Sequence, residues 1–199
     1  MEDSNAIPQR RCLVHVCCGP CSIMPLKAVL DERVKITGFF YNPNIHPRAE
    51  FLKRLQAVKT LSGLLDVECI CHEEYAPALF LRGLVASCHE RKGHPPFGER
   101  CLFCYQHRLE VTARCASERG FDSFTTSLLY SKYQRHDEIR RMGETLGERY
   151  GVRFYYVDFR GLWQDGIEAS KEMNLYRQKY CGCVYSRAER YANKRKKAT

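Results

Sequence analysis

Short runs of apolar residues alternate along the chain with longer segments that mix apolar and polar residues at helical spacing. Short apolar runs bounded by turn residues are typical of buried strands. The pattern predicts five strands, at residues 12–17, 34–41, 66–71, 121–129 and 152–159. Continuous apolar runs are typical of strands in a sheet that is covered on both faces.

The segments between these runs have the periodicity of amphipathic helices. A glycine–proline turn precedes the first of them, and Ser22 is its expected N-cap. Proline- and glycine-containing stretches at residues 42–47 and 87–100 are predicted loops. The predicted helices cover residues 22–30, 48–65, 75–85, 101–119, 136–150 and 165–174, followed by a basic helix at the end of the chain.

The alternation of strands and helices predicts an α/β fold with a mostly parallel sheet in three layers and a helical C-terminal extension. No repeat and no linker composition interrupts it, so a single domain over residues 1–199 is expected, with 1–11 and 188–199 peripheral. In such sheets ligands bind beyond the carboxyl ends of the strands. The residues that follow the first strand are therefore the first place to look for chemistry.

Composition limits the compartment and the use of the cysteines. The chain has 199 residues, of which 44% are hydrophobic and 28% charged, as in ordinary globular proteins. No run approaches the roughly 18 apolar residues of a membrane span, and the first residues lack a signal-peptide core. A cytoplasmic protein without a membrane partner is expected, so clustered cysteines indicate metal binding or redox chemistry.

The chain carries a formal net charge of +9. An excess of this size favours a polyanionic partner such as a nucleic acid. Part of it lies in the tail from Arg187 to Lys197, which is equally typical of a solvated basic end, and Arg135, Arg140 and Arg141 are further candidates for phosphate contacts. Trp163 is compatible with packing or with base stacking.

Seven of the twelve cysteines form three tight clusters, at Cys17, Cys18 and Cys21, at Cys101 and Cys104, and at Cys181 and Cys183. A Cys-x-x-Cys spacing suits zinc, an iron–sulfur cluster or a dithiol redox couple. The first two clusters offer five sulfurs where a tetrahedral zinc site needs four, and the flanking Arg100, His107 and Arg108 favour thiolates. Cys181-Gly-Cys183 is predicted as a hairpin that forms a strained, labile disulfide or supplies two ligands.

The remaining cysteines and histidines have simpler interpretations. Lone buried cysteines usually act as small apolar residues, which is expected for Cys12, Cys88 and Cys115. Cys69 and Cys71 alternate within a predicted strand and are expected to be structural. Among the histidines, His15 lies in the first strand and is expected in the core, whereas His46, His89 and His94 fall in polar loops and are expected in solvent.

Taken together, the motifs resemble the QueH-type epoxyqueuosine reductases. They occur in the family's order over about residues 12–185, and their specificity comes from the combination. The motifs are His15-Val-Cys-Cys-Gly-Pro-Cys21, Tyr41-Asn-Pro-Asn-Ile-His-Pro47, Arg100-Cys-x-x-Cys104, Thr125-Thr-Ser-Leu-Leu129 and Tyr176-Arg-Gln-Lys-Tyr-Cys-Gly-Cys183.

The resemblance implies the last step of queuosine biosynthesis, a cobalamin-independent deoxygenation of epoxyqueuosine at the wobble position of tRNA. It implies a fold similar to the nucleotide α-hydrolase (HUP-like) superfold, a [4Fe–4S] cluster with an additional mononuclear iron, and an external electron donor of unknown identity. By motif, Cys17, Cys18, Cys101 and Cys104 would hold the cluster. Cys21 would bind the second iron, and Cys181 and Cys183 would form a redox-active pair.

Two alternative functions fit the sequence less well. A tRNA-thiolating or adenylating enzyme of the same superfold would carry a Ser-Gly-Gly-x-Asp-Ser-type phosphate loop where this chain has Cys17-Cys-Gly-Pro-Cys-Ser22. A zinc-stabilised nucleic-acid-binding module would leave the surplus cysteines without a role.

Overall fold

The fold is built on a five-stranded parallel sheet in the order β3-β2-β1-β4-β5. The computed structural model describes residues 9–30, 34–87 and 98–196, with side chains described as far as Ala192. The strands are β1 (Arg10–His15), β2 (Val34–Phe40), β3 (Cys69–Cys71), β4 (Ser123–Thr126) and β5 (Arg153–Phe154). β1 pairs with both β2 and β4, which makes it the central strand.

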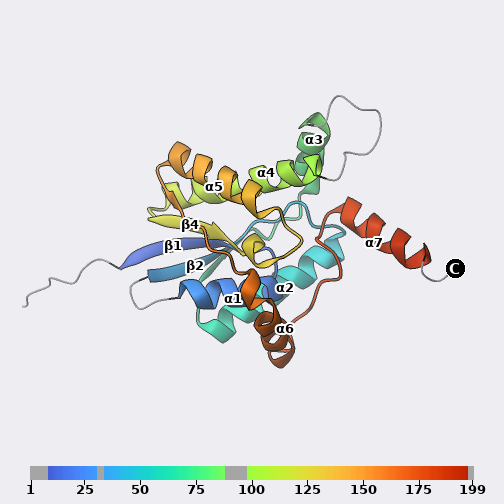
Figure 1. Cartoon of the computed structure of the whole chain (residues 1–199), viewed down its shortest axis with the longest axis horizontal. Helices are drawn as coiled ribbons and strands as arrows, with labels where there is room; N and C mark the ends of the chain where they lie inside the picture. The colour runs from blue at the N-terminus through green and yellow to red at the C-terminus, as the bar shows by residue number, and fades with distance from the viewer. Residues whose placement is uncertain (1–8, 31–33, 88–97, 197–199) are drawn as a thin grey trace, which may run out of the picture.

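Helices cover both faces of the sheet and complete three layers (Figure 1). One face carries α1 (Gly19–Val29), α2 (Arg48–Leu65) and α6 (Trp163–Glu172), while α4 (Glu99–Glu118) and α5 (His136–Tyr150) cover the other. α3 (Pro77–Ser87) packs on α4, and short 3-10 helices occupy Ser127–Tyr130 and Arg160–Leu162. The last helix, α7 (Val184–Lys196), extends away from the body, so the expected C-terminal helical extension is present.

The core lies on both sides of β1. Leu13 and Val14 are fully buried, as are Phe39 of β2 and Phe124 of β4. Burial on both faces explains why the central strand is a continuous apolar run rather than an alternating one. None of the helices in the described ranges is both long and apolar enough to cross a bilayer.

The helix predictions agree closely with the structure, and residues 48–65 and 136–150 match α2 and α5 at both ends. β1 has the predicted length but lies two residues earlier in the chain, and the other four strands are shorter than predicted. β1 and β4 end together at the pair His15 and Thr126, and the chains then diverge. Thr126 accepts a hydrogen bond from the Leu128 amide at 3.1 Å, which starts a 3-10 turn where a longer strand was predicted.

The predicted N-cap of the first helix is wrong. α1 begins at Gly19, its N-cap is Cys18, and Pro20 occupies the first turn, where a missing amide hydrogen is harmless. Ser22 lies inside the helix and donates to the Cys18 carbonyl at 2.7 Å. The helix therefore starts directly after the first cysteine pair and brings Cys21 into its first turn.

Replacing Gly143 of α5 by alanine is expected to lower the free energy of unfolding by about 1–3 kcal/mol through overpacking. A Cβ at this position would lie 2.5 Å from ring atoms of Phe154 in β5. Urea denaturation measures the effect. Gly63→Ala is the matched control, because α2 leaves open space there and the change should stabilise by up to about 1 kcal/mol. An equal gain at both glycines would contradict the tight contact.

Candidate metal and redox site

The candidate site lies at the carboxyl ends of β1 and β4, where the strand order reverses and doubly wound sheets bind ligands. The Cys17 amide donates to Ser127 Oγ at 2.9 Å and so joins the loops that follow the two strands. On the other side, Asn42 Nδ2 donates to the Val16 carbonyl at 2.9 Å. These bonds fix the backbone that carries the first cysteine pair.

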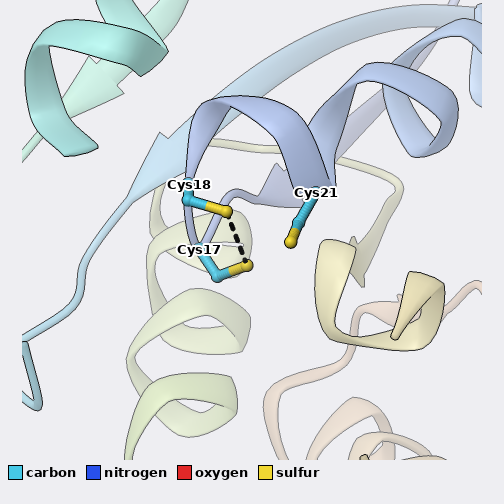
Figure 2. A group of neighbouring side chains, drawn as sticks. All are labelled: Cys17, Cys18 and Cys21. Atoms are coloured by element: carbon cyan, nitrogen blue, oxygen red, sulfur yellow. Dashed lines mark hydrogen bonds between the residues drawn. The ribbon is translucent and has the colours of Figure 1, made fainter. Parts of the chain in front are cut away.

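Cys17, Cys18 and Cys21 converge on one point, and their sulfur atoms all lie within 4.8 Å of one another. Figure 2 shows the three side chains turned toward a common space at the start of α1. Adjacent residues of a strand point to opposite faces, but Cys18 is the extended N-cap of a helix, so the chain turns between them. The two adjacent sulfurs are 3.7 Å apart.

The three thiols differ in how readily they ionise. Hydrogen bonds from Cys18 and Cys21 lower the pKa of Cys17 well below its usual value. Burial, together with the hydrogen bond to Cys17, raises the pKa of Cys18. The pKa of Cys21 is likewise raised, mainly by its hydrogen bonds with the other two. The group therefore favours one thiolate, at Cys17, with two thiols that would release protons on binding a metal.

A buried arginine of α4 lies beside this group. Arg108 Nη1 donates to Asn44 Oδ1 at 3.3 Å and to Cys104 Sγ at 3.6 Å. Burial opposes its charge, but the nearby sulfurs of Cys104, Cys17 and Cys181 outweigh burial and raise the pKa of Arg108. Its Nε and Nη2 are buried and have no hydrogen-bond partner among the residues that the structure describes. A negatively charged group among these sulfurs would satisfy them.

Another buried arginine, Arg54 of α2, positions the C-terminal cysteines. It forms an ion pair with Glu50 at 2.8 Å and donates to the carbonyls of Tyr180 and Cys181, each at 2.9 Å. Gly182 passes so close that a Cβ there would lie 3.1 Å from Arg54 Nη1, and its φ of 131° favours glycine. Both the positive φ and the close contact with Arg54 therefore favour glycine at this position of the Cys-Gly-Cys motif.

Cys181 and Cys183 are free thiols that face different surroundings. Cys181 lines a cavity of about 40 Å³ together with Cys17, Cys21 and Arg108. Cys183 lies at the start of α7, where its sulfur accepts from the Ser186 amide at 3.3 Å. The predicted hairpin is instead an irregular bend leading into the helix.

Cys101 and Cys104 occupy the first turns of α4 and are partly buried. Cys104 approaches the site through Arg108, but neither cysteine belongs to the group of sulfurs within 4.8 Å. The flanking arginines lower the pKa of these two thiols, as predicted, but the predicted preference for thiolates is wrong. Burial raises the pKa of Cys104 to about 12 and raises that of Cys101, and it outweighs Arg108 and Arg100 respectively.

The other sulfur and imidazole groups mostly have the expected roles. Cys12 is buried, and Cys69 and Cys71 lie 3.6 Å apart on β3 at the sheet edge. His15 is fully buried and bonds Thr126 Oγ1 at 2.9 Å, and burial lowers its pKa to about 3. His46 is not free in solvent, since its Nδ1 bonds the Tyr75 hydroxyl at 3.0 Å. Cys88, His89 and His94 lie outside the described residues.

The sequence identified exposed arginines as candidate phosphate contacts but not the buried polar residues near the cavity. Arg135, Arg140 and Arg141, the candidates for phosphate contacts, pair with Glu138 or Glu144 on their own helix. Sequence reasoning missed the buried residues around the cavity, because their partners are remote in the chain. These are Asn42, Asn44 and Arg54, together with Glu50, which forms an ion pair with Arg54.

The donor set fits an iron–sulfur cluster. Soft sulfur ligands suit iron–sulfur clusters and zinc, whereas the hard cations prefer oxygen. The site combines three convergent sulfurs, a fourth sulfur that accepts from Arg108, and two guanidinium nitrogens without a partner in the described part of the chain. These groups are compatible with an anionic, thiolate-bound group. Even without a fourth sulfur, Cys17, Cys18 and Cys21 could hold a metal ion.

Comparisons with known proteins agree with the site. The family model "Epoxyqueuosine reductase QueH" matches residues 12–189. A Thermotoga maritima protein named epoxyqueuosine reductase QueH is 38% identical over 183 residues, covering 89% of this chain and 91% of its own. A Dehalococcoides mccartyi protein of the same name is 35% identical over 179 residues, covering 90% and 93%. The chain therefore belongs to the QueH family of epoxyqueuosine reductases.

Proposed function

We propose that this protein reduces the epoxide of epoxyqueuosine in tRNA to the alkene of queuosine. The observation that carries the proposal is the convergence of Cys17, Cys18 and Cys21 at the switch point of the sheet, in a chain of the QueH family. Members of that family are oxidoreductases by name. The reaction takes two electrons and two protons and releases the epoxide oxygen as water.

The sulfur ligands divide by role in this proposal. Cys17, Cys18, Cys101 and Cys104 would hold a [4Fe–4S] cluster, and Cys21 would bind an additional iron. When bound, these groups supply one-electron transfer and Lewis acidity. Two observations support this role for Cys21: its sulfur lies close to the first pair, and it accepts a hydrogen bond from Gln178 Nε2 at 3.0 Å.

Cys181 and Cys183 would supply the electron pair. Oxidation of the two thiols to a disulfide releases two electrons and two protons, which balances the conversion of the epoxide to alkene and water. A disulfide across one residue is strained and easily reduced, so an external electron donor can regenerate the thiols. Arg54 supports this step because it holds the Cys181 backbone beside the cavity of about 40 Å³ that Cys181 lines with Cys17 and Cys21, here called the inner cavity.

Anaerobic purification tests the proposal. The expected product is a brown protein with at least four irons and matching acid-labile sulfide, which converts epoxyqueuosine to queuosine in tRNA when a reductant is supplied. Iron and sulfide analysis with a nucleoside assay measures both. A colourless protein that holds zinc and leaves the epoxide unchanged would contradict the proposal and favour a zinc-stabilised binding module.

A further inference from the structure

A large cavity lies directly outside the sulfur site. It has a volume of about 640 Å³, and it shares Cys21, Ser131, Gln134 and Cys181 with the inner cavity. The shared residues make it the entrance to the inner site. Its size is in the range of small-molecule pockets, which are about 300–1,000 Å³.

One wall of this pocket is aromatic. Trp163, at the start of α6, stacks on Tyr130 with 5.1 Å between ring centroids and 22° between the planes. Tyr133 stands edge-on to Trp163 at 6.1 Å and is 72% exposed. Lys132 Nζ lies 5.6 Å from the centre of the Trp163 ring, within the range of a cation–π contact. Flat bases stack on such surfaces and are held by them.

The aromatic wall is fixed from behind. The buried Tyr130 donates from its hydroxyl to the Trp163 carbonyl at 2.8 Å. A Cβ on Gly166 would lie 2.2 Å from that hydroxyl, so only glycine leaves room for the tyrosine. Rings held in one orientation lose little conformational entropy when a base stacks on them.

Another part of the pocket lining is basic. Arg177, Lys179 and Arg190 line it and are exposed, and none of the three forms an ion pair within the part of the chain that the structure describes. Single-stranded RNA is bound through this combination of stacking and phosphate contacts.

We infer that this pocket binds the modified nucleoside extruded from the anticodon loop, with its base stacked on Trp163 and in edge contact with Tyr133. Arg177, Lys179 and Arg190 would contact the flanking phosphates. The substituent of the base would then extend past Gln134 to Cys21 and Cys181. This inference rests on the proposed function and adds to it the residues that hold the base.

The chain offers a direct reporter, because Trp163 is its single tryptophan. The probe is an anticodon stem–loop RNA that carries queuosine at the wobble position and a dye at one end. Titrating the iron-loaded protein with this RNA should quench tryptophan fluorescence as dye anisotropy rises. The same RNA with an abasic wobble position should raise anisotropy without quenching.

Variants separate stacking from structure. Trp163→Leu should weaken binding of the queuosine RNA by roughly tenfold or more, while the affinity for abasic RNA stays within about twofold. Trp163→Phe should restore most of the loss. Equal weakening for both RNAs would show a structural role and overturn the inference.

The outcomes also separate this inference from the proposed function. Wild-type protein that reduces the epoxide and binds the RNA without quenching would overturn the pocket assignment alone. Protein that binds neither RNA and reduces no epoxide would overturn the proposed function together with the pocket assignment.

Discussion

Replacing Cys104 by serine is expected to remove most of the iron and sulfide and all measurable reductase activity. The alcohol of serine is a poorer ligand than a thiolate for iron in a cluster. Cys104 Sγ also accepts a hydrogen bond from Arg108 at 3.6 Å, so the variant loses one proposed ligand and loosens the arginine whose charge balances the other sulfurs. Iron and sulfide analysis and the visible absorbance of anaerobically purified protein measure the loss.

The matched control is Cys115→Ser on the same helix. Cys115 is also partly buried, but its charged neighbours are Arg119, Glu118 and Arg114 rather than the Arg108 that contacts Cys104, so iron content and activity should be unchanged. The competing ligand for the cluster is Cys21, whose sulfur lies within 4.8 Å of both Cys17 and Cys18. If Cys21→Ser empties the site while Cys104→Ser leaves it loaded, the proposed ligand set is wrong.

The part of the site near the first strand could be predicted because it depends on local sequence. A buried parallel strand followed by a turn and a helix places its next residues at the carboxyl edge of the sheet. Cys17, Cys18 and Cys21 therefore had to lie together there, whatever the rest of the chain does. The same local logic gave the bounds of α2 and α5.

Features that depend on distant packing could not be predicted. Arg54 follows Glu50 by four residues, a spacing that is typical of an exposed helical pair. It is buried because Tyr180 and Cys181, more than 120 residues away, place their carbonyls on it. The thiol pKa of Cys104 depends likewise on burial, which neighbouring arginines in the sequence do not reveal. The sequence alone does not distinguish packing from base stacking for Trp163, because the pocket that it lines is formed by segments remote in the chain.

Cys181→Ser is expected to retain iron, sulfide and absorbance near wild-type values and to abolish turnover. Its sulfur faces Cys17 and Cys21 across the inner cavity, yet its backbone is held independently by Arg54. A serine can occupy the same backbone position but cannot form a disulfide with Cys183. The metal site should therefore survive while the electron pair is lost.

Differential alkylation with mass spectrometry, before and after one anaerobic turnover, identifies the pair directly. In wild-type protein, Cys181 and Cys183 should be alkylated as free thiols before turnover and should form a disulfide after it. Cys183→Ser should lose turnover as Cys181→Ser does. Cys71→Ser, on the remote β3 edge, is the control and should behave as wild type. Loss of iron in Cys181→Ser would assign that sulfur as a ligand, because a relay thiol can be removed without opening the metal site.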